Sequence, residues 1–173
     1  MAGKIDARIA ELKLELPKAA APVANYVPVV IAGNTAYVSG QVTVFNGEFK
    51  YQGKLGKEYT VEDGQKAARM CGLNILAQLR AAIGDLDRVK RICKLGVFVN
   101  CIDSFTEQPK VANGVSDLMV EAGKTERVQK VNDTFAIDEG ARGAIAYGCE
   151  IKIAHPPSPV LSQAPTAAGS ARP

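Results

Sequence analysis

The stretch Tyr26-Val-Pro-Val-Val-Ile-Ala-Gly-Asn-Thr-Ala-Tyr-Val-Ser-Gly-Gln41 decides the fold of this chain. Two runs rich in β-branched residues flank Gly33-Asn34, and this pattern predicts two strands joined by a tight turn. The strands are expected at Val27–Ile31 and Thr35–Val44. Simple alternation along the second strand places Val38 and Gly40 on one face and Ser39 and Gln41 on the other.

A helix, a strand and a second helix are predicted after this hairpin. Thr60 is a suitable N-cap, because Glu62 and Asp63 follow it in the first turn. The apolar residues that follow recur at steps of three and four, as on one face of a helix: Ala68, Cys71, Ile75, Leu79 and Ile83. Val89–Cys101 then alternates as a strand, and Phe105–Val120 is expected to be the second helix.

The two ends of the chain differ in character. Residues 2–16 carry apolar side chains at helical spacing before Pro17, so a short N-terminal helix is expected there. Near the other end, Val128–Phe135 and Cys149–Ala154 are candidate strands. Residues 155–173 are rich in Pro and Ala and cannot build a core. We therefore expect one domain over 1–154 and a disordered or extended tail over 155–173.

The composition is that of a globular protein with balanced charge. The chain has 173 residues, of which 47% are apolar and 23% charged, enough for one domain with a core. The net charge is +3, from 21 basic and 18 acidic residues spread along the sequence. Such a weak, dispersed charge argues against nucleic acid as a partner.

One loop departs from this balance. It carries three lysines next to two tyrosines, a combination that can contact phosphates and stack on bases: Lys50, Lys54, Lys57, Tyr51 and Tyr59. Glu48 and Glu58 dilute its charge. A solvated surface loop is the more common explanation of such a segment.

The sequence predicts neither a metal nor a cofactor. The four cysteines show no C-x-x-C spacing, and His155 is the only histidine. No apolar run follows the charges at the N-terminus, so no signal peptide is expected. No stretch approaches the roughly 20 apolar residues of a membrane span. A cytoplasmic protein with reduced thiols is the resulting expectation.

Six segments of the chain resemble the Rid/YjgF family, the reactive intermediate deaminases also described as endoribonuclease L-PSP. The similarity is greatest to the longer bacterial members of the family. No single motif is decisive, but the order and spacing of the segments are fairly specific. The matching segments are Asn25–Pro28, Tyr37–Gln41, Gly53–Gly56, Gly84–Val89, Lys94–Asn100 and Phe105–Asn113.

The resemblance implies a chorismate-mutase-like α+β fold in which one sheet packs two helices on one face. It also implies a homotrimer whose ligand clefts lie between subunits. Members of the family hydrolyse short-lived enamines and imines, such as 2-iminopropanoate, to a keto acid and ammonia. The expected partner is therefore a small metabolite that bears a carboxylate.

An arginine is expected to hold the carboxylate of such a substrate, since a guanidinium donates two parallel hydrogen bonds to it. By resemblance, the family's arginine opens the strand after the second helix, where this chain has Arg127. Arg142 is a rival, because Ala141-Arg142 resembles the family's Ala-Arg pair, although its spacing to the last strand is short. A solvated arginine at a strand end is the alternative explanation for Arg127.

By the same resemblance, Glu150 on the final strand would position the attacking water. An outward-facing acid on an alternating strand explains it equally well. The separation between Arg127 and Glu150 is longer than the family's, because residues 132–148 have no counterpart. The C-terminal part of the chain therefore departs from the family pattern.

Four further residues match family positions that line the ligand cleft: Tyr26, Ser39, Gly40 and Asn113. Each has a plainer explanation. Tyr26 could simply pack beside Pro28, and Gly40 could mark a close contact within the sheet. Asn113 could lie at the surface or cap a helix.

Three functions follow as hypotheses. The first is hydrolysis of 2-imino acids by a homotrimer, with Arg127 and Glu150 as the catalytic pair. The second is a trimer of the same fold that binds a small metabolite without converting it. The third is cleavage of single-stranded RNA, which only the family's second description and the basic loop suggest.

Overall fold

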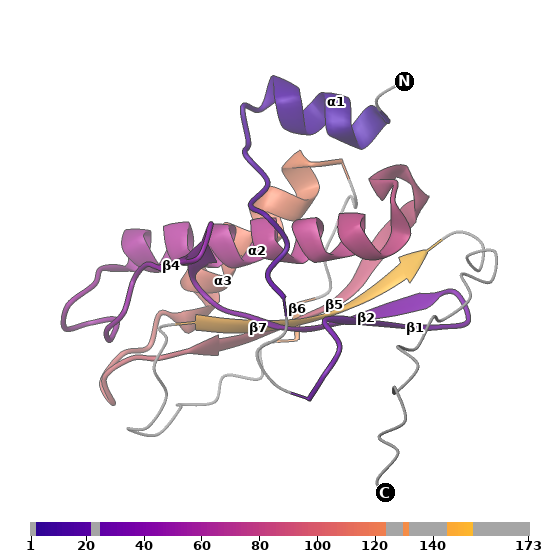
Figure 1. Ribbon diagram of the computed structural model, residues 1–173. Coiled ribbons are helices and arrows are strands. Elements are labelled where there is room, and N and C mark those ends of the chain that lie inside the picture. Colours follow the sequence, from indigo (N-terminus) through magenta and orange to yellow (C-terminus); the bar gives the residue numbers. More distant parts are fainter. Residues whose placement is uncertain (1–2, 22–24, 124–129, 132–144, 154–173) are drawn as a thin grey trace, which may run out of the picture.

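The structure, a computed structural model, describes residues 3–21, 25–123, 130–131 and 145–153, the last two ranges by their backbone (Figure 1). Three helices, one 3₁₀ turn and seven strands are described within these ranges. In chain order they are α1 (Lys4–Glu11), β1 (Val29–Ala32), β2 (Thr35–Gln41), β3 (Val44–Phe45), β4 (Glu48–Phe49), α2 (Val61–Ile83), η1 (Leu86–Arg88), β5 (Val89–Val99), α3 (Gln108–Glu121), β6 (Lys130–Val131) and β7 (Ile145–Ile153).

Five of the strands form one sheet in the order β1-β2-β7-β5-β6, and β3 and β4 form a separate hairpin. The last strand, β7, lies between β2 and β5 and is antiparallel to both. The short β6 pairs with β5 in parallel. The centre of the sheet is therefore built from strands far apart in the sequence, with the chain's last strand joining the two halves.

The predicted hairpin and the first long helix are both confirmed. Gly33 turns the chain between β1 and β2 with a φ of +58°, a value that favours glycine. Helix α2 begins after Thr60, whose hydroxyl accepts a hydrogen bond from the Asp63 N–H, while the Asp63 carboxylate accepts one from the Thr60 N–H. The five apolar residues of the predicted stripe are all buried on this helix.

Helices α2 and α3 cover one face of the sheet, as expected (Figure 1). The two helices approach most closely at Gly114 of α3. A Cβ atom at this position would lie 2.1 Å from the backbone oxygen of Gln65 on α2, so only glycine permits this contact. Ile75, Leu76 and Met119 fill the core beside the contact and are fully buried.

Helix α1 lies outside the α2–α3 layer (Figure 1). Asp87 of η1 binds its N-terminus, because the carboxylate accepts hydrogen bonds from the backbone N–H groups of Lys4 (2.6 Å) and Ile5 (2.8 Å). Arg80 of α2 pairs with Asp6 at 3.2 Å. These contacts attach the N-terminal helix to the helical layer.

The second strand departs from simple alternation. Its register with β7 shifts between Val38 and Gln41, so that the strand contains an irregularity of the β-bulge type. As a result Gln41 is buried, whereas Gly40 is exposed. The prediction that Val38 and Gly40 share a face, with Gln41 opposite, was therefore wrong, because strict alternation does not survive an inserted residue.

Several predicted boundaries also shift. The N-terminal helix spans only Lys4–Glu11, not 2–16, because Lys13 takes a φ of +53° and turns the chain. Helix α3 begins at Gln108, after a turn in which the Phe105 N–H donates to the Ile102 oxygen. Strand β7 begins at Ile145, earlier than the predicted Cys149.

Three earlier expectations lie outside the described residues. They are the positions of Arg127 and Arg142 and the tail over 155–173. Within the described part of the chain, no helix combines the length and the apolar character that crossing a membrane requires.

Candidate functional site

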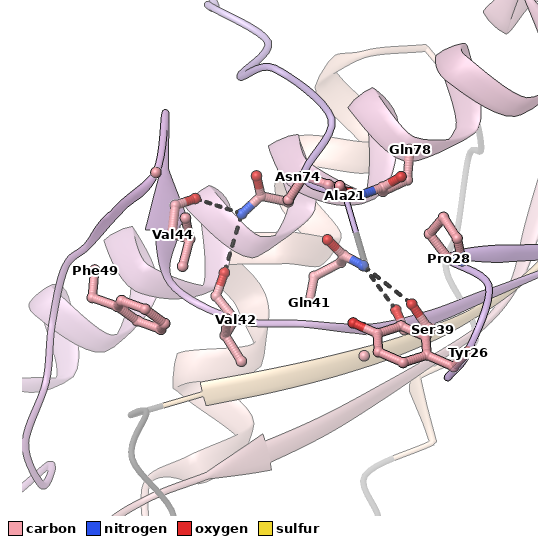
Figure 2. A pocket seen from close by; sticks show the side chains of 13 residues that line it. Ala21, Tyr26, Pro28, Ser39, Gln41, Val42, Val44, Phe49, Asn74 and Gln78 are labelled. Atoms are coloured by element: carbon pink, nitrogen blue, oxygen red, sulfur yellow. Dashed lines mark hydrogen bonds between the residues drawn. The ribbon is translucent and has the colours of Figure 1, made fainter. Parts of the chain in front are cut away.

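A pocket of about 300 Å³ lies between β2, α2, the β3–β4 hairpin and the segment that precedes β1 (Figure 2). Its volume is at the small end of the range for ligand sites, roughly 300–1,000 Å³. Most of its wall is apolar, with Val42, Val44 and Phe49 along one side. Its polar lining residues are Tyr26, Ser39, Gln41, Asn74 and Gln78.

Three of these polar residues are primary amides held in one orientation. Asn74 Nδ2 donates to the backbone oxygens of Val42 (3.1 Å) and Val44 (2.8 Å). Gln78 Nε2 donates to the Ala20 oxygen at 2.8 Å, and Gln41 Nε2 donates to the Ser39 oxygen at 3.2 Å.

A carbonyl oxygen accepts hydrogen bonds only, so each of these contacts requires the NH₂ end of the amide. The backbone thereby settles the orientation of each amide, which is otherwise ambiguous. In Figure 2 the Gln41 side chain extends from β2 toward α2, where Asn74 and Gln78 lie.

Sequence reasoning did not assign Gln41, Asn74 or Gln78 to the site. A signal was present for two of them. Asn74 and Gln78 are four residues apart on α2, and each immediately precedes a residue of the predicted apolar stripe, Ile75 or Leu79. Polar residues at the buried edge of a helix require partners. Gln41 gave no comparable signal, because the register shift in β2 reverses its face.

Tyr26, Ser39 and Gly40, three of the predicted substrate-binding residues, line this one pocket. The Ser39 N–H donates to the Pro28 oxygen at 2.9 Å, which holds the end of β2 beside the segment carrying Tyr26. Tyr26 is 47% exposed and lines the same pocket as Ser39 (Figure 2). An aromatic ring in this position can cover a bound molecule.

The fourth predicted residue, Asn113, does not line the pocket. It belongs to α3 and is half-buried, and its backbone oxygen accepts a hydrogen bond from the Ser116 hydroxyl at 3.2 Å. The structure therefore places Asn113 apart from Tyr26, Ser39 and Gly40.

Glu150 pairs with Tyr37 of β2 on one side and with Lys94 of β5 on the other. Tyr37 and Lys94 are both exposed. They alternate with buried Val38 and Leu95, whose side chains belong to the core under the helices, so they stand on the helix-free face of the sheet. The register thus puts Glu150 in a cross-strand row with two exposed residues of that face.

The described residues that line the pocket carry no formal charge. Apart from the Tyr26 phenol, none of its lining residues ionises. A carboxylate placed in it would need a cation from another part of the protein, because a buried charge without a partner is costly.

Cys71, the fully buried cysteine of the described core, is unsuited to act as a nucleophile. Burial raises the pKa of the Cys71 thiol far above its ordinary value, so the thiolate, the reactive form, is suppressed. No cluster of three or more potential metal ligands occurs in the described ranges.

The basic loop is largely neutralised by its own acids. Lys50 pairs with Glu48, and Lys57 pairs with Glu58 at 3.1 Å. The backbone N–H of Lys54 also donates to the Glu58 carboxylate, and it is the main reason that the pKa of Glu58 is lowered. These glutamates remain charged at neutral pH and oppose phosphate binding by the loop.

A family model described as "YjgF/chorismate_mutase-like, putative endoribonuclease" matches residues 6–139. This chain belongs to the YjgF/chorismate mutase-like family. The YjgF-like α+β fold is thereby confirmed, and so is the resemblance to Rid and L-PSP proteins.

Individual relatives agree with this assignment. Protein TCP17 of Trypanosoma cruzi is 50% identical over 118 residues, which cover 68% of this chain and 74% of that protein. A crystal structure of a "putative endoribonuclease" from Shewanella oneidensis is 34% identical with a TM-score of 0.81, covering 87% of this chain and 100% of that one. RidA of an Antarctic Psychrobacter is 22% identical with a TM-score of 0.53, covering 79% of this chain and 94% of that one, and shows the fold alone.

Proposed function

We propose that this YjgF-family chain is a cytoplasmic, homotrimeric hydrolase that converts 2-imino acids to keto acids and ammonia. The observation that carries the proposal is the convergence of Tyr26, Ser39 and Gly40 on one pocket of about 300 Å³. The resemblance predicts these three residues from the sequence alone, independently of their positions in the structure. A pocket of this size suits a small metabolite better than a polymer.

The proposed reaction uses two residues that the resemblance assigns to the family's catalytic positions. The Arg127 guanidinium holds the substrate carboxylate through two parallel hydrogen bonds and supplies the cation that the pocket itself lacks. Glu150 accepts a proton from a water whose oxygen forms a bond to the imine carbon. That proton passes to the nitrogen and gives a carbinolamine. The proton of its hydroxyl group then passes through Glu150 to the amine, the carbonyl forms as the carbon–nitrogen bond breaks, and ammonia leaves the keto acid.

The helix-free face of the sheet supports the proposed trimer. Val30 of β1 and Tyr37 of β2 are 50% and 46% exposed, which is high for large apolar residues on a sheet. Exposed apolar surface of this kind commonly marks a contact between subunits. Glu150 lies next to Tyr37 in the register, so association through this face would bring it to a subunit boundary.

The function is tested by competition for a short-lived imine. An amino-acid oxidase generates 2-iminopropanoate from alanine in the presence of semicarbazide, which traps the imine as a semicarbazone. The wild-type protein is expected to lower the rate of semicarbazone formation in proportion to its concentration. Arg127→Ala is expected to abolish this effect, while Arg142→Ala, the matched control, retains it.

If Arg142→Ala loses the effect on semicarbazone formation and Arg127→Ala keeps it, Arg142 and not Arg127 binds the substrate carboxylate. If both variants keep full activity, neither arginine binds the substrate carboxylate. Native mass measurement of the wild type tests the trimer separately, and a monomer would refute the subunit arrangement.

A second candidate, binding without turnover, is favoured by one observation. The only ionisable group in the pocket wall is the Tyr26 phenol, so the described residues bind but do not supply a general base. This candidate predicts saturable binding of pyruvate without any effect on semicarbazone formation. Ribonuclease activity is less well supported, because Lys50 and Lys57 are already paired with glutamates.

A further inference from the structure

The inner part of the pocket presents hydrogen-bond acceptors that nothing in the described protein satisfies. Gln41, Asn74 and Gln78 are buried, with 9%, 9% and 5% of their surface exposed. Each uses its NH₂ group on a backbone oxygen. Among the described residues, no hydrogen bond reaches the side-chain oxygen of any of the three.

These oxygens cannot become donors by rotating the amides. A flip of Asn74 would set its oxygen against the backbone oxygens of Val42 and Val44, and a flip of Gln78 would set its oxygen against that of Ala20. The same holds for Gln41 and the Ser39 oxygen. The fold therefore fixes three acceptors among the described residues that line the pocket, and the Asn74 amide, which donates twice, keeps no free N–H.

The chemistry of a complementary ligand follows from this arrangement. A neutral N–H or O–H donor satisfies the acceptors, while the apolar side chains of Val42, Val44 and Phe49 contact the carbon atoms that carry it. A carboxylate would face oxygens of the same partial charge with no cation in the lining. A purely apolar group would leave the amide oxygens buried without a donor.

We infer that this pocket receives the side chain of the substrate and selects one that ends in a neutral hydrogen-bond donor, such as a primary carboxamide, over one that ends in a carboxylate. The inference rests on the proposed function for its assignment of the substrate's other end to Arg127. It adds Gln41, Asn74 and Gln78 as residues that determine specificity.

Three stable probes of nearly equal shape test the selection. Each has a carboxylate at one end, and the other end is a carboxamide in glutaramate, a carboxylate in glutarate and an isopropyl group in 5-methylhexanoate. Isothermal titration of the wild-type protein is expected to show glutaramate binding at least about tenfold more tightly than either of the others, which corresponds to one well-made hydrogen bond. Equal affinity, tighter binding of glutarate or 5-methylhexanoate, or no saturable binding of glutaramate would overturn the inference.

A pair of variants localises the effect. Gln78→Met keeps the length of the side chain but removes the acceptor, and it should abolish the preference for glutaramate. Gln65→Met is the matched control, because Gln65 lies on the same helix and also donates its Nε2 to a backbone oxygen, that of Lys110 at 3.0 Å, outside the pocket. This variant should keep the preference.

Loss of the preference in the control, or its survival in Gln78→Met, would contradict the assignment. If Gln78→Met does not fold, Gln41→Met provides the same comparison from the sheet side. The wild-type comparison of the three probes does not depend on either variant.

The two proposals fail in different ways. Selective binding of glutaramate without any effect on imine trapping would refute the hydrolase and leave the pocket assignment intact. Imine hydrolysis without discrimination among the three probes would refute the pocket assignment and leave the hydrolase proposal intact.

Discussion

Replacing Asn74 with leucine tests whether the amide that shapes the pocket also stabilises the fold. Leucine has the same number and branching of side-chain heavy atoms, so the change mainly removes hydrogen bonds. Asn74 donates two of them, to Val42 and Val44, and they tie α2 to the β2–β3 connection and to the first residue of β3. The side chain is only 9% exposed, so water cannot fully replace it.

The expected loss follows from the partners that remain. The Val42 oxygen keeps a hydrogen bond from the Val44 N–H at 2.8 Å, so it is not left without a donor. Two net hydrogen bonds at roughly 0.5–1.5 kcal/mol each give an expected decrease of about 2 kcal/mol in the free energy of unfolding. Leaving either oxygen buried without any donor would cost more.

Equilibrium unfolding in urea, followed by far-ultraviolet circular dichroism, measures this decrease. The chain has no tryptophan, so circular dichroism is the more direct signal. The protein concentration must be held fixed, because association of subunits adds to apparent stability. Gln65→Leu, which removes one hydrogen bond from a half-buried residue, is the control and should lose less than Asn74→Leu.

A decrease below about 0.5 kcal/mol, the lower end of one hydrogen bond, would refute the reasoning. So would a decrease no greater than that of the control. In either case the amide would be a feature of the ligand site without a structural role.

Two further predictions concern the helical layer. Gly114→Ala should lower the free energy of unfolding by about 2 kcal/mol, because forcing α2 and α3 apart outweighs the gain of about 1 kcal/mol in helix propensity. Gly72→Ala should lose less in the same urea titration, because its Cβ would meet side-chain atoms of Leu118 and Val115 and no backbone atom. The pKa of Asp63 is lowered by three hydrogen bonds. In order of effect, their donors are the Thr60 backbone N–H, the Thr60 hydroxyl and the Lys66 ammonium. The stabilising effect of Asp63 is therefore present above the unfolded pKa of about 3.9 and is lost as the pH falls through the lower folded value. The melting temperatures of wild type and Asp63→Asn should converge as the pH drops from 7 to 3, and parallel curves would contradict the capping role.

The elements that the sequence predicted well are those with strong local signals. The capping box at Thr60, the glycine at the β1–β2 turn and the apolar stripe of α2 are each determined by neighbouring residues. The position of β7 was not predictable in this way. It pairs with β2 and β5, which are distant in sequence, and its start at Ile145 falls in a stretch rich in Gly and Ala.

The candidate site shows the same difference between what the sequence predicts and what depends on contacts between distant segments. Resemblance selected Tyr26, Ser39 and Gly40, and these line the pocket. It gave no indication of Asn74 or Gln78, whose role depends on backbone oxygens of Ala20, Val42 and Val44. Ala20 and Val42 lie between regular elements, and Val44 begins the two-residue strand β3. No local pattern determines the positions of such segments.

The register shift in β2 links the fold to the chemistry of the pocket. Without the shift, alternation would turn Gln41 toward the helix-free face and place Gly40 under α2. The pocket would then lose one of its three amides and gain a residue without a side chain. Because the shift lies between Val38 and Gln41, it leaves the Ala36–Val38 part of the strand packed in the core while turning the following residues toward the ligand site. Irregularities of this kind often lie next to functional sites, and here the irregularity is what allows one short strand to serve both purposes.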